Sequence, residues 1–230
     1  MVELIVALDV DRGSEALRFL DRLPQVRWVK VGSRLMTREG GGLLRRLTDR
    51  GLHVFLDLKW HDIPNTVVGA VEAARDLGVR MATIHGLGGP EMLEAAGQAA
   101  RGLKLIAVTV LTSHDGESYG SAVGRSDVSI GDEVARLTQM AFASGLSGVV
   151  CSPHEVATAR AALGPTGLIV VPGIRRSADP SGDQRRVATP RQAVSDGATH
   201  LVVGRPILTA REPSQVFRQI REEVEACGQP

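Results

Sequence analysis

The segment 57–66 holds three charged side chains whose types and spacing suit acid–base chemistry. Asp57 and Lys59 are two residues apart, so on a β-strand their side chains would point to the same side. Asp62 follows three residues after Lys59, where residues 63–65 turn the chain toward a helix. A lysine kept cationic by flanking carboxylates can deliver a proton to a reacting atom. The same spacing also fits a structural ion pair that fixes the loop after a strand.

Lys30 could extend this group to an alternating array of lysines and aspartates. Acidic clusters often hold magnesium, but here each carboxylate has a lysine close in sequence, which would repel a cation. The six histidines show neither HxH nor HExxH spacing. We therefore predict that the site holds no metal.

Composition limits the class of protein. The chain has 230 residues, 43% hydrophobic and 23% charged, which predicts one domain spanning residues 1–230. Its net charge of +1 does not favour nucleic acid or an acidic membrane as a partner. Cys151 and Cys227 form no CxxC pattern and predict neither a disulfide framework nor a zinc site. Because the N-terminus does not resemble a signal peptide and no apolar run approaches membrane-spanning length, we expect a cytoplasmic protein.

Short apolar runs and helical segments alternate along the chain. Runs that are apolar on both faces and rich in Val and Ile indicate buried parallel strands. We expect strands over Leu4–Val10, Trp28–Gly32, His53–Trp60, Met81–His85, Lys104–Leu111, Gly148–Ser152, Gly167–Ile174 and His200–Gly204. We expect helices over Ser14–Leu23, Leu43–Arg50, Thr66–Leu77, Glu91–Arg101, Asp132–Ser144, His154–Leu163, Pro190–Asp196 and Ser214–Ala226, with Thr66 as an N-cap.

Eight strand–helix units in a chain of this length predict an α/β fold of the (β/α)₈ TIM-barrel type. A doubly wound open sheet is the alternative, although the chain has no dinucleotide-binding fingerprint. Active sites of such barrels lie at the C-terminal ends of the strands. The polar residues at or just after these ends are Asp9, Lys30, Asp57, Lys59, Thr112, Ser113, Arg175, Gly204 and Arg205. Any one of them could merely cap the sheet, but together they indicate a site.

The loops after the seventh and eighth strands suit a phosphate group. Pro172 to Arg175 lead into a long polar loop that includes Gln184, and Gly204 and Arg205 end the last strand. Barrels often bind phosphate between these two loops, where backbone N–H groups and arginines converge. Glycine at 204 would allow the backbone to approach the anion closely. An ordinary solvated loop is the alternative.

These segments together resemble the bacterial type of orotidine 5′-phosphate decarboxylase. The resemblance rests on segments in the expected order over nearly the whole chain: residues 7–9, 29–32, 57–66, 108–113, 171–175, 182–184, 186–190 and 202–207. The motif DLKxHDIPNT, with the later DQ and VGRPI segments, is highly specific. Trp60 stands where the family often has Phe, a change that should affect packing only.

The resemblance implies decarboxylation of orotidine monophosphate to uridine monophosphate, in pyrimidine biosynthesis and without a cofactor. It implies that Lys59 protonates carbon 6, with Asp57, Asp62 and Lys30 as its charged partners. It also implies a homodimer in which Asp62 and Thr66 reach the partner's site. The implied substrate contacts are Asp9, Lys30, Ile63, Thr66, Thr112, Ser113, Pro172, Arg175, Gln184, Gly204 and Arg205.

Two other functions are compatible with the sequence. The first is a magnesium-dependent sister barrel enzyme, such as a keto-gulonate-phosphate decarboxylase or a hexulose-phosphate synthase. The second is a barrel that binds a phosphorylated ligand without turnover, and the intact set of Asp57, Lys59 and Asp62 argues against it.

Overall fold

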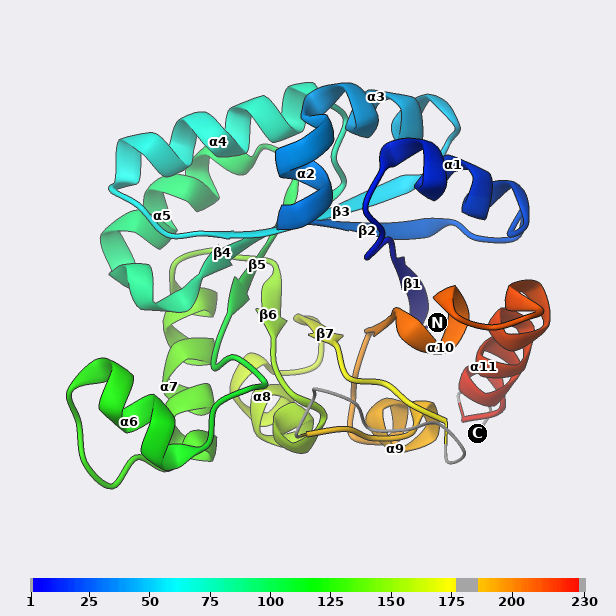
Figure 1. The fold of residues 1–230 in the computed structure, drawn as a ribbon. Helices are drawn as coiled ribbons and strands as arrows, with labels where there is room; N and C mark the ends of the chain where they lie inside the picture. The colour runs from blue at the N-terminus through cyan, green and yellow to red at the C-terminus, as the bar shows by residue number, and fades with distance from the viewer. Residues whose placement is uncertain (1, 177–185, 228–230) are drawn as a thin grey trace.

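A computed structural model describes residues 2–176 and 186–227 of the chain (Figure 1). Within these residues the strands close into a barrel, and each strand is parallel to its neighbours in chain order. β8 returns to pair with β1, which completes the closure. The strands are β1 (Glu3–Ala7), β2 (Trp28–Gly32), β3 (His53–Trp60), β4 (Met81–His85), β5 (Lys104–Val108), β6 (Gly148–Val150), β7 (Leu168–Val171) and β8 (His200–Val203). The predicted (β/α)₈ barrel is confirmed.

Helices surround the barrel on the outside (Figure 1). They are α1 (Gly13–Asp21), α2 (Ser33–Glu39), α3 (Gly41–Asp49), α4 (Pro64–Asp76), α5 (Gly89–Ala100), α6 (Gly116–Val123), α7 (Ile130–Ala143), α8 (Val156–Leu163), α9 (Pro190–Ser195), α10 (Arg205–Leu208) and α11 (Pro213–Cys227). Two short 3₁₀ turns, Gly86–Gly88 and Pro153–Glu155, follow β4 and β6. None of the described helices is long and apolar enough to cross a membrane.

Apolar residues on both faces of the strands explain the barrel. One face packs against the helices and forms the larger hydrophobic cluster. The other face fills the interior with a second cluster of Ile5, Ala7, Trp28, Phe55, Met81, Ile106, Val170 and Val202. Burial on both faces is the reason that these runs read as continuous apolar segments rather than alternating ones.

Several predicted strand ends are wrong. β1 ends at Ala7 rather than Val10, β5 ends at Val108 rather than Leu111, and β6 and β7 are also shorter than predicted. The residues after the true ends remain apolar because they pack beneath the loops: Leu8, Val110 and Ile174 are all buried. Hydropathy alone therefore extends a strand beyond its hydrogen-bonded part.

The predicted helices are confirmed within a few residues, but Thr66 is not an N-cap. α4 begins at Pro64, and Ile63 occupies the cap position with no side-chain hydrogen bond. Proline supplies the start instead, because its fixed φ suits the first helical turn. Three further helices, α2, α6 and α10, were not predicted. They are short segments within the connections that follow strands.

Candidate active site

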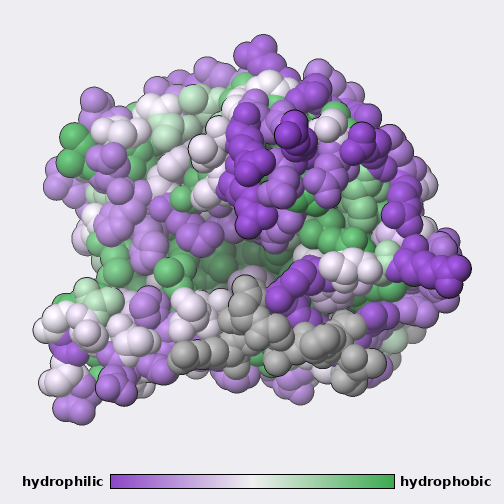
Figure 2. Space-filling view, viewed as in Figure 1, coloured by the Kyte–Doolittle hydropathy of each residue, from purple (hydrophilic) through white to green (hydrophobic). Residues whose placement is uncertain are grey.

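The C-terminal ends of the strands surround a cavity of about 260 Å³. Ala7, Phe55, Val170 and Val202, which belong to the barrel interior, form part of its apolar lining. Figure 2 shows a hollow across this face, with hydrophobic residues inside it and hydrophilic residues along its upper rim. The cavity therefore combines an apolar lining with charged groups at its edge, as ligand sites commonly do.

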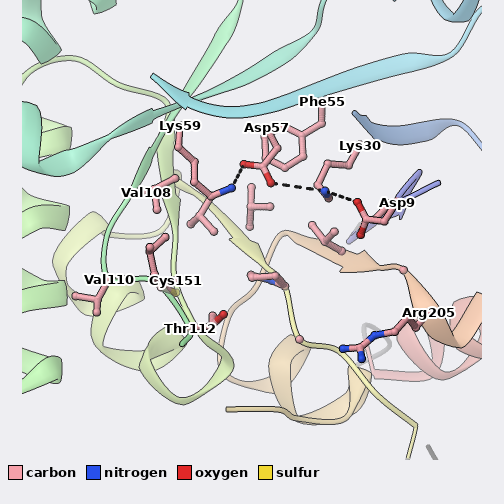
Figure 3. Close-up of a pocket in the computed structure, with 18 of the residues that line it drawn as sticks. Asp9, Lys30, Phe55, Asp57, Lys59, Val108, Val110, Thr112, Cys151 and Arg205 are labelled. Carbon is pink, nitrogen blue, oxygen red and sulfur yellow. Dashed lines mark hydrogen bonds and ion pairs between the residues drawn. The ribbon is translucent and has the colours of Figure 1, made fainter. Parts of the chain in front are cut away.

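Four charged residues form a continuous row on one wall of this cavity (Figure 3). Asp9 Oδ1 lies 3.0 Å from Lys30 Nζ, and Lys30 Nζ lies 3.7 Å from Asp57 Oδ2. The other carboxylate oxygen of Asp57 accepts a hydrogen bond from Lys59 Nζ at 2.8 Å. Lysine and aspartate alternate in this row, but it ends in Asp9 and does not include Asp62, which was predicted to belong to the array. Asp9 lies two residues beyond the end of β1, and Lys30 lies inside β2.

Asp57 is ionised at the centre of this row. Its side chain is 16% exposed, and burial by itself would raise its pKa. The charges of Lys30 and Lys59 have the opposite effect, together with hydrogen bonds from Lys59 and Thr83, and the pKa lies below its ordinary value. The side chain of Lys59 is more exposed, at 38%, and lines the cavity. The row therefore places the amino group of a cavity-lining lysine next to a fixed carboxylate.

The backbone at Lys59 departs from a regular strand. Its φ is +55°, in the left-handed region, and the register between β3 and β4 shifts between Leu56 and Trp60. The side chains of Asp57 and Lys59 meet as expected, but not through the simple alternation of a strand. Instead, the Lys59 backbone N–H donates to Thr83 Oγ1 at 2.8 Å. Non-glycine residues in this conformation are uncommon and cluster at functional sites.

Four of the residues predicted for the phosphate side lie at the same cavity as the charged row. Pro172, Arg175, Gly204 and Arg205 line the same cavity, as does Thr112. Arg175 is buried, and its Nη1 donates to the Ile174 carbonyl oxygen at 2.8 Å. A Cβ atom added to Gly204 would lie 3.4 Å from Asp9 Oδ2, an ordinary contact, so space alone does not require glycine there.

The described lining of the cavity includes neither of two other predicted substrate contacts. Ser113 is exposed and is not among the described residues that line the cavity. Gln184 lies outside the residues that the structure describes. Their predicted roles in substrate binding stay predictions.

The second half of the 57–66 motif lies at a different surface of the protein from Asp57 and Lys59. Asp62 and Ile63 line an open groove together with His61, Pro64, Gly88, Glu91 and Met92. Asp62 Oδ1 accepts the Ile63 backbone N–H at 2.7 Å, and Ile63 is 67% exposed. Thr66, on the first turn of α4, is also exposed. Within one chain, therefore, the structure brings Asp57 and Lys59 together but places Asp62 apart from them.

Sequence reasoning missed Thr83 and most of the apolar wall. Thr83 is fully buried, and its hydroxyl donates to Asp57 Oδ1 at 3.1 Å. A polar residue in the middle of the apolar run Met81–His85 was the signal available in the sequence. Cys151 also lines the cavity, and burial strongly raises the pKa of its thiol. The described residues contain no group of three or more His, Cys, Asp or Glu side chains arranged to hold a metal ion.

Comparisons with known proteins agree with this arrangement. The family model described as "Orotidine 5'-phosphate decarboxylase / HUMPS family" matches residues 2–220. This chain belongs to that family. Orotidine 5'-phosphate decarboxylases of Halorhodospira halophila and Dichelobacter nodosus are 49% and 46% identical to it, over 98% and 94% of this chain and 97% and 96% of theirs. The crystal structure of orotidine 5'-phosphate decarboxylase from Lactobacillus acidophilus matches with a TM-score of 0.85 at 34% identity, covering 97% of this chain and 99% of that one.

Membership of the orotidine 5'-phosphate decarboxylase / HUMPS family confirms the resemblance inferred from sequence motifs. The match extends over nearly the whole barrel, so it includes both the charged row and the cavity residues Pro172, Arg175, Gly204 and Arg205. The cavity at the C-terminal ends of the strands is accordingly the candidate active site of a family member.

Proposed function

We propose that this protein decarboxylates orotidine 5′-monophosphate to uridine 5′-monophosphate and carbon dioxide, a step of pyrimidine biosynthesis. The observation that carries the proposal is the row Asp9–Lys30–Asp57–Lys59 at the cavity wall, with Lys59 Nζ 2.8 Å from Asp57. Curated relatives at 44–49% identity, all named for this activity, support it. The whole chain is proposed to act as one catalytic domain in the cytoplasm.

The chemistry requires a cation beside the carbon that loses its carboxylate. When the bond from carbon 6 to the carboxylate breaks, its electron pair stays on carbon 6 and carbon dioxide leaves. The Lys59 ammonium stabilises the developing carbanion more than it stabilises the bound substrate, which is the condition for catalysis. Lys59 then transfers a proton to carbon 6 and regains one from water. Asp57 favours the charged ammonium and holds it in place, and Lys30 contacts the other carboxylate oxygen of Asp57.

The remaining cavity residues are proposed to orient the substrate. Arg175, Arg205 and the backbone at Gly204 suit the phosphate, because arginine forks and backbone N–H groups are good anion donors. Pro172 and Thr112 would contact the base, and Asp9 and Lys30 the ribose hydroxyls. Gln184, Ser113 and the partner's loop are proposed to complete these contacts. Binding energy from the phosphate, remote from carbon 6, would then be used to fix the base against Lys59.

An ultraviolet assay of the purified protein with orotidine monophosphate, with and without EDTA, tests the proposal. We expect substrate absorbance to be lost at the same rate in both cases. Activity abolished by EDTA, with no turnover of orotidine monophosphate, would instead favour a magnesium-dependent sister enzyme within the same family. Substrate binding without turnover would indicate a non-catalytic barrel, and both results contradict the proposal.

We also propose that the active site is shared between two copies of the chain. Asp62 lies outside the cavity of its own chain, and Ile63 is strongly exposed, so both are available to a second copy. In this arrangement Asp62, Ile63 and Thr66 of one chain reach the cavity of the other. Mixing inactive Lys59→Ala and Asp62→Ala proteins should then restore about a quarter of wild-type activity, because half of the dimers are hybrids with one intact site.

One outcome of the mixing experiment would contradict the shared active site. Subunit exchange is first confirmed by mass spectrometry of differently tagged proteins. If exchange is complete and the mixture stays inactive, Asp62 does not act across the interface. A mixture of Lys59→Ala with Asp57→Asn is the matched control, since both changes lie on the same side of the site and hybrids would contain no intact one.

A further inference from the structure

Thr83 occupies an unusual place for a polar side chain. It lies in the middle of β4 and is fully buried among the strands. Its hydroxyl makes two hydrogen bonds to residues of β3: Oγ1 accepts the Lys59 backbone N–H at 2.8 Å and donates to Asp57 Oδ1 at 3.1 Å. One hydroxyl therefore contacts both members of the ion pair at the cavity wall.

The hydrogen bond from the Lys59 backbone N–H to Thr83 lies where the pairing of β3 with β4 is irregular. Between the paired residues Leu56↔Ala82 and Trp60↔Ile84, β3 advances four residues while β4 advances only two. The residues between leave the regular register, and Lys59 adopts a left-handed φ of +55°. A buried backbone N–H in such a segment needs a partner other than the regular ladder. The Thr83 hydroxyl provides it.

The second bond follows from the first. A threonine hydroxyl has one proton and accepts through its lone pairs. Since Oγ1 accepts from Lys59, its own proton is directed to Asp57 Oδ1, the same oxygen that receives the Lys59 ammonium at 2.8 Å. The carboxylate is thereby held in one orientation, with its second oxygen facing Lys30.

We propose that Thr83 is a positioning residue for the proton donor, which fixes both the backbone of Lys59 and the carboxylate that its ammonium group contacts. The inference rests on the proposed decarboxylase function. Thr83 itself is absent from the cavity lining, so it acts through Asp57 and Lys59 and not on the substrate.

The charged groups around the pair come from several strands. Lys30 of β2 faces Asp57, and Asp9, beyond β1, contacts Lys30. On β4, His85 stands two residues after Thr83, and burial, then His61 and Lys59, lower its pKa to about 4. His85 is therefore neutral near pH 7, and the charges that act on Asp57 there are the two lysines. The Thr83 hydrogen bond adds to their effect by favouring the ionised carboxylate.

Three variants separate a positioning role from a purely structural one. Thr83→Val keeps the side-chain shape and removes both hydrogen bonds, while Thr83→Ser restores the hydroxyl. Thr109→Val is the matched control, because Thr109 is also fully buried and its hydroxyl bonds only to the Val150 carbonyl oxygen among the described residues, at 2.8 Å. For each protein, kcat, KM, the pH dependence of kcat and the melting temperature are measured with orotidine monophosphate.

We expect Thr83→Val to lower kcat by about 10- to 100-fold with little change in KM, since a misplaced donor affects the reaction more than binding. The acid limb of its kcat profile should move upward by about 0.5–1 pH unit, because Asp57 loses a hydrogen bond to its ionised form. Thr83→Ser should recover most of the wild-type kcat. Thr109→Val should lower the melting temperature without moving the acid limb.

Each contrary result has a distinct meaning. If folded Thr83→Val keeps the wild-type kcat and acid limb, Thr83 is merely structural and the inference is wrong. If Thr83→Ser is as impaired as Thr83→Val, the hydroxyl is not the group that matters and the inference is again wrong. An inactive wild-type protein would contradict the proposed decarboxylase function instead, so the two failures are distinguishable.

Discussion

The two ends of the barrel are built by the same strands, but their polar side chains differ in charge and in the partners that they contact. At the C-terminal end, Asp9, Lys30, Asp57 and Lys59 are charged, and each is within 4 Å of an opposite charge. At the N-terminal end, Trp28 lies between two imidazoles. Its ring meets His53 edge-on with centroids 4.9 Å apart and His200 with centroids 5.6 Å apart.

The histidines at the N-terminal end are kept neutral by their surroundings. Burial, and then the charge of Lys104, lower the pKa of His200 to about 4. Burial, followed by the charges of Arg80 and Arg27, also lowers the pKa of His53. The Thr199 hydroxyl lies 2.9 Å from His200 Nδ1 and gives that ring a hydrogen-bond partner. At this end of the barrel, the indole ring of Trp28 and the two imidazole rings therefore pack against one another.

The difference between the ends shows how one fold separates stability from chemistry. A partly buried side chain stays ionised where opposite charges surround it, as at Asp57. Charged groups held in place in this way can stabilise a reaction intermediate. Where burial outweighs any opposite charge, as at His53 and His200, the neutral imidazole is favoured and contributes packing. Substitutions at the C-terminal end should therefore change activity, and those at the N-terminal end should change stability.

The largest effect is expected for Lys59→Ala. Loss of the ammonium group removes both the electrostatic stabilisation and the proton donor, so kcat/KM should fall by about 10⁴-fold or more. The melting temperature should change little, because the side chain is partly exposed. Lys104→Ala is the control: Lys104 is an exposed lysine that begins β5 at the opposite end of the barrel. Equal losses in the two variants would contradict the separation of roles.

Trp28→Ala should act on stability instead. Removing a large buried ring typically costs about 3–5 kcal/mol of unfolding free energy. The kcat of the protein that remains folded should stay close to that of the wild type, since Trp28 lies outside the cavity lining. Urea unfolding and active-site titration measure the two quantities separately. A large fall in kcat per folded molecule would show that the two ends are coupled.

The stability of the N-terminal end should depend on pH through His200. The pKa of His200 in the folded protein, about 4, lies below the ordinary histidine value of 6.5, so the unfolded chain binds more protons between these two pH values. His200 therefore does not reduce the free energy of unfolding well above pH 6.5. As the pH decreases toward 4, this group lowers the free energy of unfolding by on the order of 3 kcal/mol. Urea titrations of the wild type and His200→Gln at pH 7.5 and 4.5 isolate this contribution. His154→Gln, a change at an exposed histidine, is the control, and its pH dependence should match the wild type.

Ser113→Ala is expected to have the smallest effect. Ser113 is exposed and outside the cavity lining, so kcat/KM should change by less than about threefold. Thr112→Ala, at the neighbouring position that does line the cavity, should raise KM more. Steady-state kinetics of the two variants measures which substitution has the larger effect on KM and kcat/KM. A larger effect at Ser113 would mean that the loop rearranges around the substrate.

The sequence predicted the barrel because buried strands and amphipathic helices have distinct periods that local composition reveals. It did not predict α6, whose residue Tyr119 hydrogen-bonds to buried Glu133 of α7 at 2.8 Å. Asp115 and Ser118 form a local capping box at its start, but the contact with α7 is not visible in the local pattern of apolar residues. The register shift that gives Lys59 its left-handed backbone was also missed, because it arises between two strands.

Much of the candidate site could be predicted from position along the chain. Asp57, Lys59 and Arg205 are found at the cavity because the ends of parallel strands converge on one rim. Thr83 could not be inferred in this way, since its role depends on the pairing of β4 with an irregular part of β3. The separation of Asp62 from Lys59 likewise required the path of the chain after β3.

Release of labelled carbon dioxide tests the central claim most directly. Orotidine monophosphate labelled in its carboxylate is incubated with the wild type and with Lys59→Ala, both in EDTA. We predict that the wild type releases one labelled carbon dioxide for each uridine monophosphate formed, and that Lys59→Ala releases about 10⁴-fold less per unit time. No release by the wild type, or release by Lys59→Ala at the wild-type rate, would contradict the account.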